Sequence, residues 1–127
     1  MSNRRYSAKQ LFQFRVIKDG KENRRRICEE RIVSFLADSE IQALEEAKAR
    51  GHESEDSYSI EDRQVFFEFV GILELIDLVD DEESGEVWWN LCEKVSPMER
   101  REKLIPPESE LFVFKDLSIR KRGRLKL

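Results

Sequence analysis

Histidine and cysteine are scarce in this chain. Its 127 residues include one histidine, His52, and two cysteines, Cys28 and Cys92. Both cysteines lie within apolar stretches, which predicts buried thiols rather than a disulfide, and the three residues lack zinc-ligand spacing. Nucleophilic catalysis needs a base beside the nucleophile, whereas His52 follows a predicted helix end and is placed to cap it. The sequence therefore predicts no enzyme, no metal and no cofactor.

Glycine-rich loops and membrane-spanning runs are also missing. The five glycines form no phosphate-binding loop. The longest apolar run, residues 65–79, is interrupted by Glu68, Glu74 and Asp77, so it does not fit a membrane span. The N-terminal residues contain no apolar core of a signal peptide. These features are typical of a cytoplasmic protein that does not bind membranes.

The charge is abundant but unevenly distributed. Residues 1–26 carry a net charge of +7 and residues 120–127 carry +5, whereas residues 27–119 carry −16. Basic ends of this kind can bind nucleic acid. The candidate contacts for that alternative are Arg24, Arg25, Arg26, Arg120, Lys121, Arg122 and Arg124. We favour basic ends that lie back on the acidic body, because a body of this charge repels phosphate.

Two strands are predicted before the first helix. Alternating apolar and polar residues indicate one strand over residues 6–18 and another over residues 27–37. Asp19-Gly20 is a turn signal, but the polar residues 21–26 favour a longer loop over a tight hairpin. We therefore expect two strands joined by a charged loop.

A capped helix is predicted over residues 39–50. Ser39 and Gln42 have the spacing of a capping box, in which each side chain accepts a hydrogen bond from a free backbone N–H. Gly51 stands where a left-handed residue often ends a helix. Leu44 lies on an apolar stripe with helical spacing, which predicts that the helix packs on a sheet.

The third predicted strand, residues 65–79, is unusually long. It follows a polar loop over residues 52–61 and is apolar on both faces, apart from Glu68 and Glu74. Gly71 near its middle indicates a bulge or a bend. A strand with two apolar faces needs cover on both sides. One helix covers one side only, so the other side requires another segment or another subunit.

The remaining residues predict a fourth strand and an arm. An acidic turn over residues 80–86 leads into a strand over residues 87–95. Residues 96–107 indicate a short polar helix or loop, and residues 111–119 a last strand or an extended arm. Together the patterns predict a single α+β domain over residues 1–119, followed by a flexible basic tail over residues 120–127. Its expected architecture is β-β-α-β-β, a twisted and mainly antiparallel sheet with one helix packed on a face and an extended C-terminal arm.

Three stretches resemble a known family. They are residues 6–12 (YSAKQLF), residues 29–33 (EERIV) leading into 37–40 (ADSE), and residues 67–75 (FEFVGILEL). In order and spacing they are similar to the bacterial domain-of-unknown-function family forty-two eighty-eight, over about residues 6–79. The resemblance implies a small stand-alone bacterial protein with one shared fold. It implies no activity and no functional residue.

These observations favour a non-catalytic protein-binding module, such as a toxin-neutralising immunity protein or a small regulator. An acidic body complements a basic partner surface, for example that of a basic toxin. The candidate partner contacts are Phe66, Glu68, Glu74, Trp88 and Trp89. Surplus apolar strand surface also predicts a homodimer with Phe66 and one of the two tryptophans in its interface. A nucleic-acid-associated protein that uses the basic loop and tail is the alternative.

Overall fold

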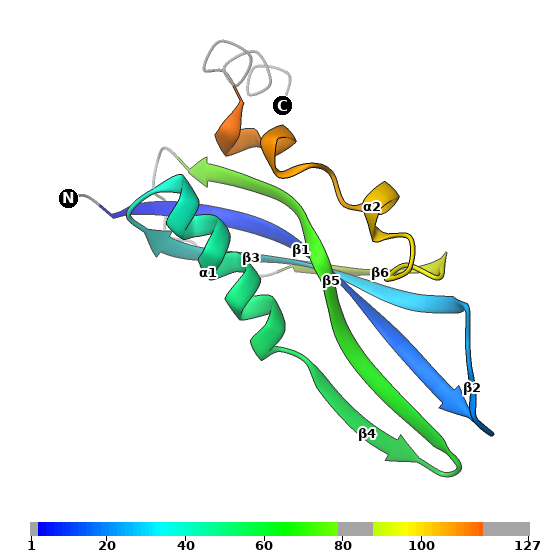
Figure 1. Cartoon of the computed structure of the whole chain (residues 1–127). Helices are drawn as coiled ribbons and strands as arrows, with labels where there is room; N and C mark the ends of the chain where they lie inside the picture. Colours follow the sequence, from blue (N-terminus) through cyan, green and yellow to red (C-terminus); the bar gives the residue numbers. More distant parts are fainter. Residues whose placement is uncertain (1–2, 79–87, 116–127) are drawn as a thin grey trace.

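The structure is a computed structural model that describes residues 3–78 and 88–115, and only the backbone of residues 88–92. Its central feature is an open, strongly twisted sheet with one long helix across a face (Figure 1). The predicted acidic turn and basic tail lie outside the described residues. In chain order the elements are β1 (Arg4–Lys18), β2 (Lys21–Glu22), β3 (Arg25–Ala37), α1 (Glu40–Glu53), β4 (Asp56–Ile60), β5 (Arg63–Leu78), β6 (Trp88–Val95), α2 (Arg101–Leu104), η1 (Glu108–Glu110) and η2 (Phe112–Phe114).

The sheet is antiparallel throughout the described residues. Its six strands include the path β4-β5-β1-β3-β6, and β2 pairs with β1. The α+β class and the mainly antiparallel sheet are therefore confirmed. The predicted β-β-α-β-β order is coarser than this structure, which adds strands β2 and β4 and has the short helix α2 where a short polar helix or loop was expected.

The two elements that the sequence did not predict are both exposed hairpin strands. Asp19 and Gly20 have φ angles of 54° and 74°, and two positive φ angles allow a tight two-residue hairpin between β1 and β2. The prediction of a longer loop is therefore wrong. Lys21 and Glu22, which follow the turn, pair with β1 while their side chains stay exposed to solvent. In the same way, β4 replaces part of the predicted polar loop. All five β4 residues are exposed, so apolar alternation could not reveal a strand held mainly by pairing with β5.

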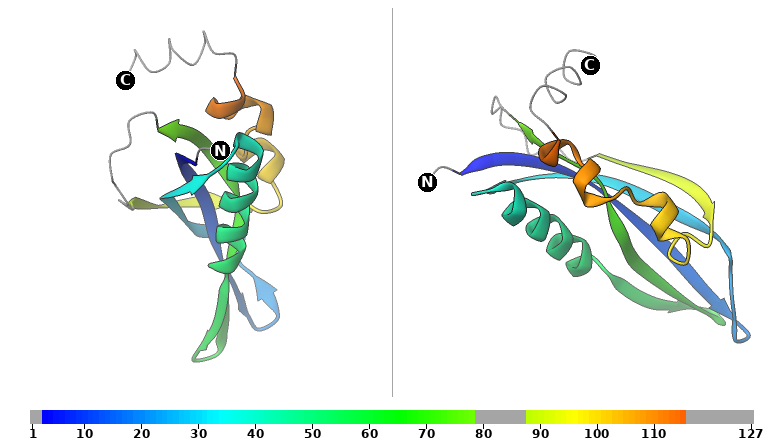
Figure 2. Two further views of the ribbon diagram at one scale, coloured as in Figure 1. Left: turned by 90° about the vertical axis from the view of Figure 1, so that its left-hand side faces the viewer. Right: turned by 45° about the horizontal axis from the view of Figure 1, so that its top comes forward.

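Two bulges bend β5 around Gly71. The pairing with β1 skips Val70 and Leu73, which are the extra residues on the β5 side. This confirms the irregularity expected at Gly71, and Figure 2 shows the curved path of the strand. The bulges also change which residues share a face. Phe69 and Ile72 enter the same core cluster although their positions differ in parity, whereas strict alternation had placed them on opposite faces.

The helix begins as predicted but ends later. The Ser39 hydroxyl accepts the Gln42 N–H at 3.1 Å, and the Gln42 side chain accepts from the Asp38 N–H. The helix then continues through Gly51 to Glu53, so the predicted terminal role of Gly51 is wrong. Gly51 is needed for close packing instead. A Cβ at this position would lie 2.5 Å from Cδ1 of Phe69.

The core has two parts, one on each face of the sheet. The larger part lies under α1, where Ala43, Leu44 and Ala47 pack with residues of β1, β3 and β5. The smaller part lies on the opposite face around Leu11, and it includes buried Cys28. No helix in the described residues is both long and apolar enough to cross a membrane.

Residues 96–115 form a C-terminal arm that follows β5. The expected strand in this region is wrong for residues 111–115, which contain the 3₁₀ turn η2 instead. Leu111 and Val113 of this turn region are buried in the larger core. Met98 and Ile105 pack on the smaller one. The arm therefore supplies, within one chain, part of the cover that the second face requires.

Gly51→Ala is expected to destabilise the protein even though alanine favours helix formation. The helix propensity gain is about 0.5–1 kcal/mol, whereas overpacking against the Phe69 ring costs about 1–3 kcal/mol. We expect a lower urea midpoint. In a Phe69→Leu background, Gly51→Ala should lower the urea midpoint by less than it does in the wild-type protein. An unchanged or higher midpoint for Gly51→Ala would show that the helix and β5 are not in tight contact here.

Candidate functional site

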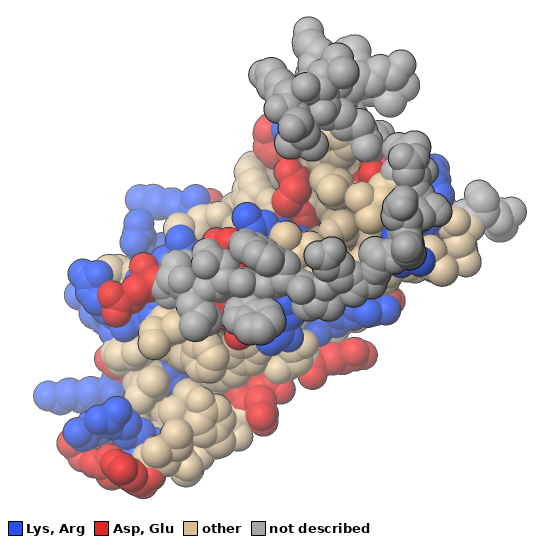
Figure 3. Space-filling view, turned by 180° about the vertical axis from the view of Figure 1, so that it is seen from behind, with Lys and Arg blue, Asp and Glu red and all other residues tan. Residues whose placement is uncertain are grey.

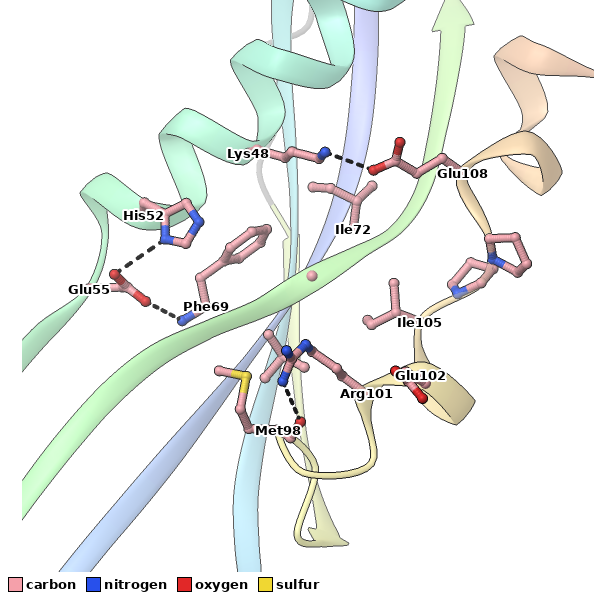
Figure 4. Close-up of a pocket in the computed structure, with 14 residues that line it drawn as sticks. Lys48, His52, Glu55, Phe69, Ile72, Met98, Arg101, Glu102, Ile105 and Glu108 are labelled. Carbon is pink, nitrogen blue, oxygen red and sulfur yellow. Dashed lines mark hydrogen bonds and ion pairs between the residues drawn. The ribbon is translucent and has the colours of Figure 1, made fainter.

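A groove runs over β5 between α1 and the arm. Its volume is about 660 Å³, and Figures 2 and 4 both show the strand passing between the helix and the arm. The bent part of β5 forms the floor, with Phe69 and Ile72 beneath the helix side. The lining residues are Lys48, His52, Glu55, Phe69, Val70, Gly71, Ile72, Met98, Arg101, Glu102, Ile105, Pro106, Pro107 and Glu108.

A second hollow of about 460 Å³ continues along the same helix. It is lined by Ile41, Leu44, Glu45, Lys48, Glu108, Ser109 and Phe114. The two hollows share Lys48 and Glu108, whose side chains form an ion pair at 2.7 Å between α1 and η1. We call the two hollows together the long groove. One exposed ion pair divides it, and its apolar lining continues on both sides.

The helix side of the long groove carries a histidine that is held by its neighbours. His52 Nδ1 lies 3.4 Å from a Glu55 carboxylate oxygen, and its ring packs edge-on against Phe69. The other Glu55 oxygen accepts the backbone N–H of Phe69 at 2.9 Å. The Glu55 side chain thus satisfies a backbone N–H at the edge of β5, next to the point where the pairing with β4 ends.

The chemistry of the long groove suits binding. Among the lining residues, Ser109 carries a hydroxyl group. It lies in the second hollow, beyond the Lys48–Glu108 pair, whereas His52 lies in the first. Apolar floor residues and rim charges of both signs can hold a polypeptide whose side chains alternate in character. Within the described part of the chain, no group of three His, Cys, Asp or Glu residues has a metal-binding arrangement.

A polar network on the opposite face fixes the arm that forms one wall of the groove. Its members, which we call the polar clamp, are Gln13, Arg15, Glu22, Arg26, Glu68 and Glu99. The Arg26 side chain is 1% exposed and binds both oxygens of Glu99, at 2.9 and 3.1 Å. The side-chain oxygen of Gln13, Oε1, accepts from Arg26 and from the Met98 N–H. The start of the arm is therefore tied to two strands.

Two carboxylates of the polar clamp, Glu68 and Glu99, are stabilised in their charged form. Hydrogen bonding from Arg15 lowers the pKa of Glu68, and burial opposes that effect. Hydrogen bonding from Arg26 lowers the pKa of Glu99. Glu68 binds Arg15 through both carboxylate oxygens, with a shortest distance of 2.7 Å. The clamp therefore stabilises the folded protein more at neutral pH than at acidic pH.

The predicted partner contacts are dispersed, and the three whose side chains the structure describes do not line the long groove. Phe66 lies under the Arg15 guanidinium, 4.5 Å from the ring centre, and Glu68 belongs to the polar clamp. Glu74 accepts the Phe112 N–H at 2.7 Å and so holds η2 in place. The backbones of Trp88 and Trp89 pair with β3, and their side chains lie outside the described residues.

The nucleic-acid candidates are also separated. Arg26 is enclosed by the polar clamp, which leaves no guanidinium surface for phosphate. Arg25 is exposed and lies 3.8 Å from Glu93, and Arg24 is exposed beside it. The four candidates in the tail lie outside the described residues. On the face seen in Figure 3, basic and acidic side chains are interspersed rather than gathered by sign.

The comparison with protein families now gives an identity at the family level. Residues 5–89 match the domain of unknown function DUF4288. The chain belongs to this family. Comparisons with curated proteins and with solved structures gave no match. The DUF4288 match contains α1 and β5, one wall and the floor of the long groove, but it ends before the arm.

Sequence reasoning missed the long groove because no motif marks it. One signal was available for Arg26, which has the same parity as the buried Cys28 on β3 and therefore points to the same face. A buried arginine requires acceptors, and this could have directed attention to Glu99. The position of Pro106 and Pro107 in the groove lining has no comparable signal in sequence.

Glu99→Gln is expected to reduce stability at neutral pH and to have a smaller effect at acidic pH. The pKa of Glu99 is lower in the folded than in the unfolded protein, so its stabilisation is complete above the unfolded value. It is lost as the pH falls through the folded value. Since the carboxylate is half exposed, we expect about 1 kcal/mol from urea midpoints at pH 7. Exposed Glu102→Gln is the matched control, and equal losses for Glu99→Gln at both pH values would contradict a charge-based clamp.

Proposed function

We propose that this DUF4288 protein is a non-catalytic protein-binding module that holds an extended segment of a partner in the long groove. The observation that supports it is the groove itself, with a floor made by the bent β5 and walls made by α1 and the arm. An extended chain can place apolar side chains on Phe69 and Ile72 and polar ones at the rim.

The dimensions favour a polypeptide over a compact ligand. The helix wall extends from Ile41 to His52, which is about 16 Å at 1.5 Å per residue. An extended segment of about five residues has that length. Ile41 is 67% exposed although it stands on this wall, so an apolar partner side chain that covers it gains hydrophobic burial.

The charges at the rim favour a basic partner. The carboxylates are Glu45, Glu55, Glu102 and Glu108, against the cations Lys48 and Arg101. Basic side chains that flank an apolar segment would complement this excess. A basic toxin neutralised by an immunity protein, or the target of a small regulator, fits the description. A homodimer is a weaker proposal, because the arm already covers Leu11 on the second face.

Peptides selected against the full chain test the proposed site. Random twelve-residue peptides displayed on phage would be selected with the wild-type protein, and their affinities compared for two variants by fluorescence anisotropy. Ile41→Glu places a charge in the groove wall. Ile60→Glu is the matched control, since Ile60 is 51% exposed on β4, away from the groove. We expect Ile41→Glu to weaken binding by about tenfold or more, as for loss of a central apolar contact.

Two results would contradict this proposal. One is a set of selected peptides whose affinities fall equally in Ile41→Glu and Ile60→Glu, because the groove would then have no special role. The other is strong, salt-sensitive binding of DNA or RNA in a gel shift near physiological salt. That result would favour the nucleic-acid alternative through Arg24, Arg25 and the basic tail.

A further inference from the structure

The described chain stops at one end of the long groove. Phe114 lines the second hollow, and Lys115 is the last described residue of the arm. The next twelve residues, 116–127, therefore start beside the groove mouth. When extended, such a segment spans about 40 Å, more than twice the length of the helix wall. The segment is therefore long enough to extend along the whole groove.

The composition of this segment matches the groove. Residues 116–127 contain five Lys or Arg residues, one Asp, and four Leu or Ile residues. The groove offers an apolar floor and two more carboxylates than cations. In addition, α1 presents its C-terminal end at the far end of the groove, where cations are favoured. Charge and apolar surface are thus complementary in the same place.

We propose that residues 116–127 bind in the long groove of their own chain and compete there with a partner. This inference rests on the proposed function, because it assigns a second, internal occupant to the same site. Basic side chains of the segment interact with Glu45, Glu102 and Glu108, and its leucines lie on the floor. The segment therefore carries the same combination of basic and apolar side chains that the groove favours in a partner.

The Lys48–Glu108 pair gives the inference a distinctive consequence. Lys48 repels a basic segment, whereas Glu108 attracts it, and both side chains are about half exposed. Lys48→Gln and Glu108→Gln break the same ion pair. If that pair acted only as a link between α1 and η1, both variants would have the same effect. If a basic segment lies beside it, the two effects have opposite signs.

Trypsin cleavage within the segment measures its accessibility in the full chain. Mass spectrometry would follow cleavage after Arg120, Lys121, Arg122 and Arg124, with a synthetic peptide of residues 116–127 as the fully accessible reference. At low salt we expect cleavage about fivefold slower in the protein than in the peptide, and a smaller difference at about 0.5 M salt. Lys48→Gln should slow cleavage about two- to threefold and Glu108→Gln accelerate it similarly.

Exposed Glu110→Gln is the matched control, because Glu110 lies in the same 3₁₀ turn but does not line the groove. The inference is overturned if the segment is cleaved as fast as the peptide, if Lys48→Gln and Glu108→Gln act in the same direction, or if Glu110→Gln equals Glu108→Gln. Protection that rises with protein concentration would assign the segment to a second copy and also overturn it. Cleavage needs no partner, so a groove that binds selected peptides while the segment stays fully cleavable refutes this inference alone.

Discussion

The doubly bulged path of β5 is the constraint on which the rest of the structure depends. The bulges at Val70 and Leu73 allow one strand to pair with β1 over its length and to direct Phe69 and Ile72 under the same helix. β4 covers only the first part of its outer edge, and the arm and α1 border the rest. A straight strand would have alternated its apolar residues between two faces. The bulges instead place both Phe69 and Ile72 in the core under α1, while Val70 belongs to the core on the opposite face, and the bent strand leaves a floor between two walls.

The wall formed by the arm depends on electrostatics more than the wall formed by α1 does. The helix is held by buried apolar residues and by the contact between Gly51 and Phe69, and neither involves a titratable group. The arm begins with Glu99 on a buried arginine, and enclosing a charge is costly unless its partners remain ionised. Ile105 packs against Gly71, so loss of the clamp would also loosen the groove floor. Groove shape and clamp charge are therefore linked.

Sequence reasoning succeeded where local chemistry determines the outcome and failed where pairing does. The helix start follows from Ser39 and Gln42, and the irregularity in β5 follows from Gly71, because caps and bulges have local signals. β4 has no such signal, since its residues are exposed and only the neighbouring strand makes it a strand. The groove was harder still to predict, because its two walls, α1 and the arm, are far apart in sequence and are brought together only by the folded structure.

An internal basic segment would tune partner binding rather than block it. A tethered segment experiences an effective concentration of about 1 mM, so an intrinsic dissociation constant of about 0.25 mM leaves the groove about one-fifth free. A partner then loses only about fivefold in apparent affinity, whereas a segment that binds at about 10 μM would cost it about a hundredfold. Exposed ion pairs and a short apolar contact place the segment nearer the weaker limit. Because competition of this kind lowers the apparent affinity of every groove ligand by the same factor, the segment sets how tightly a partner must bind and does not exclude partners.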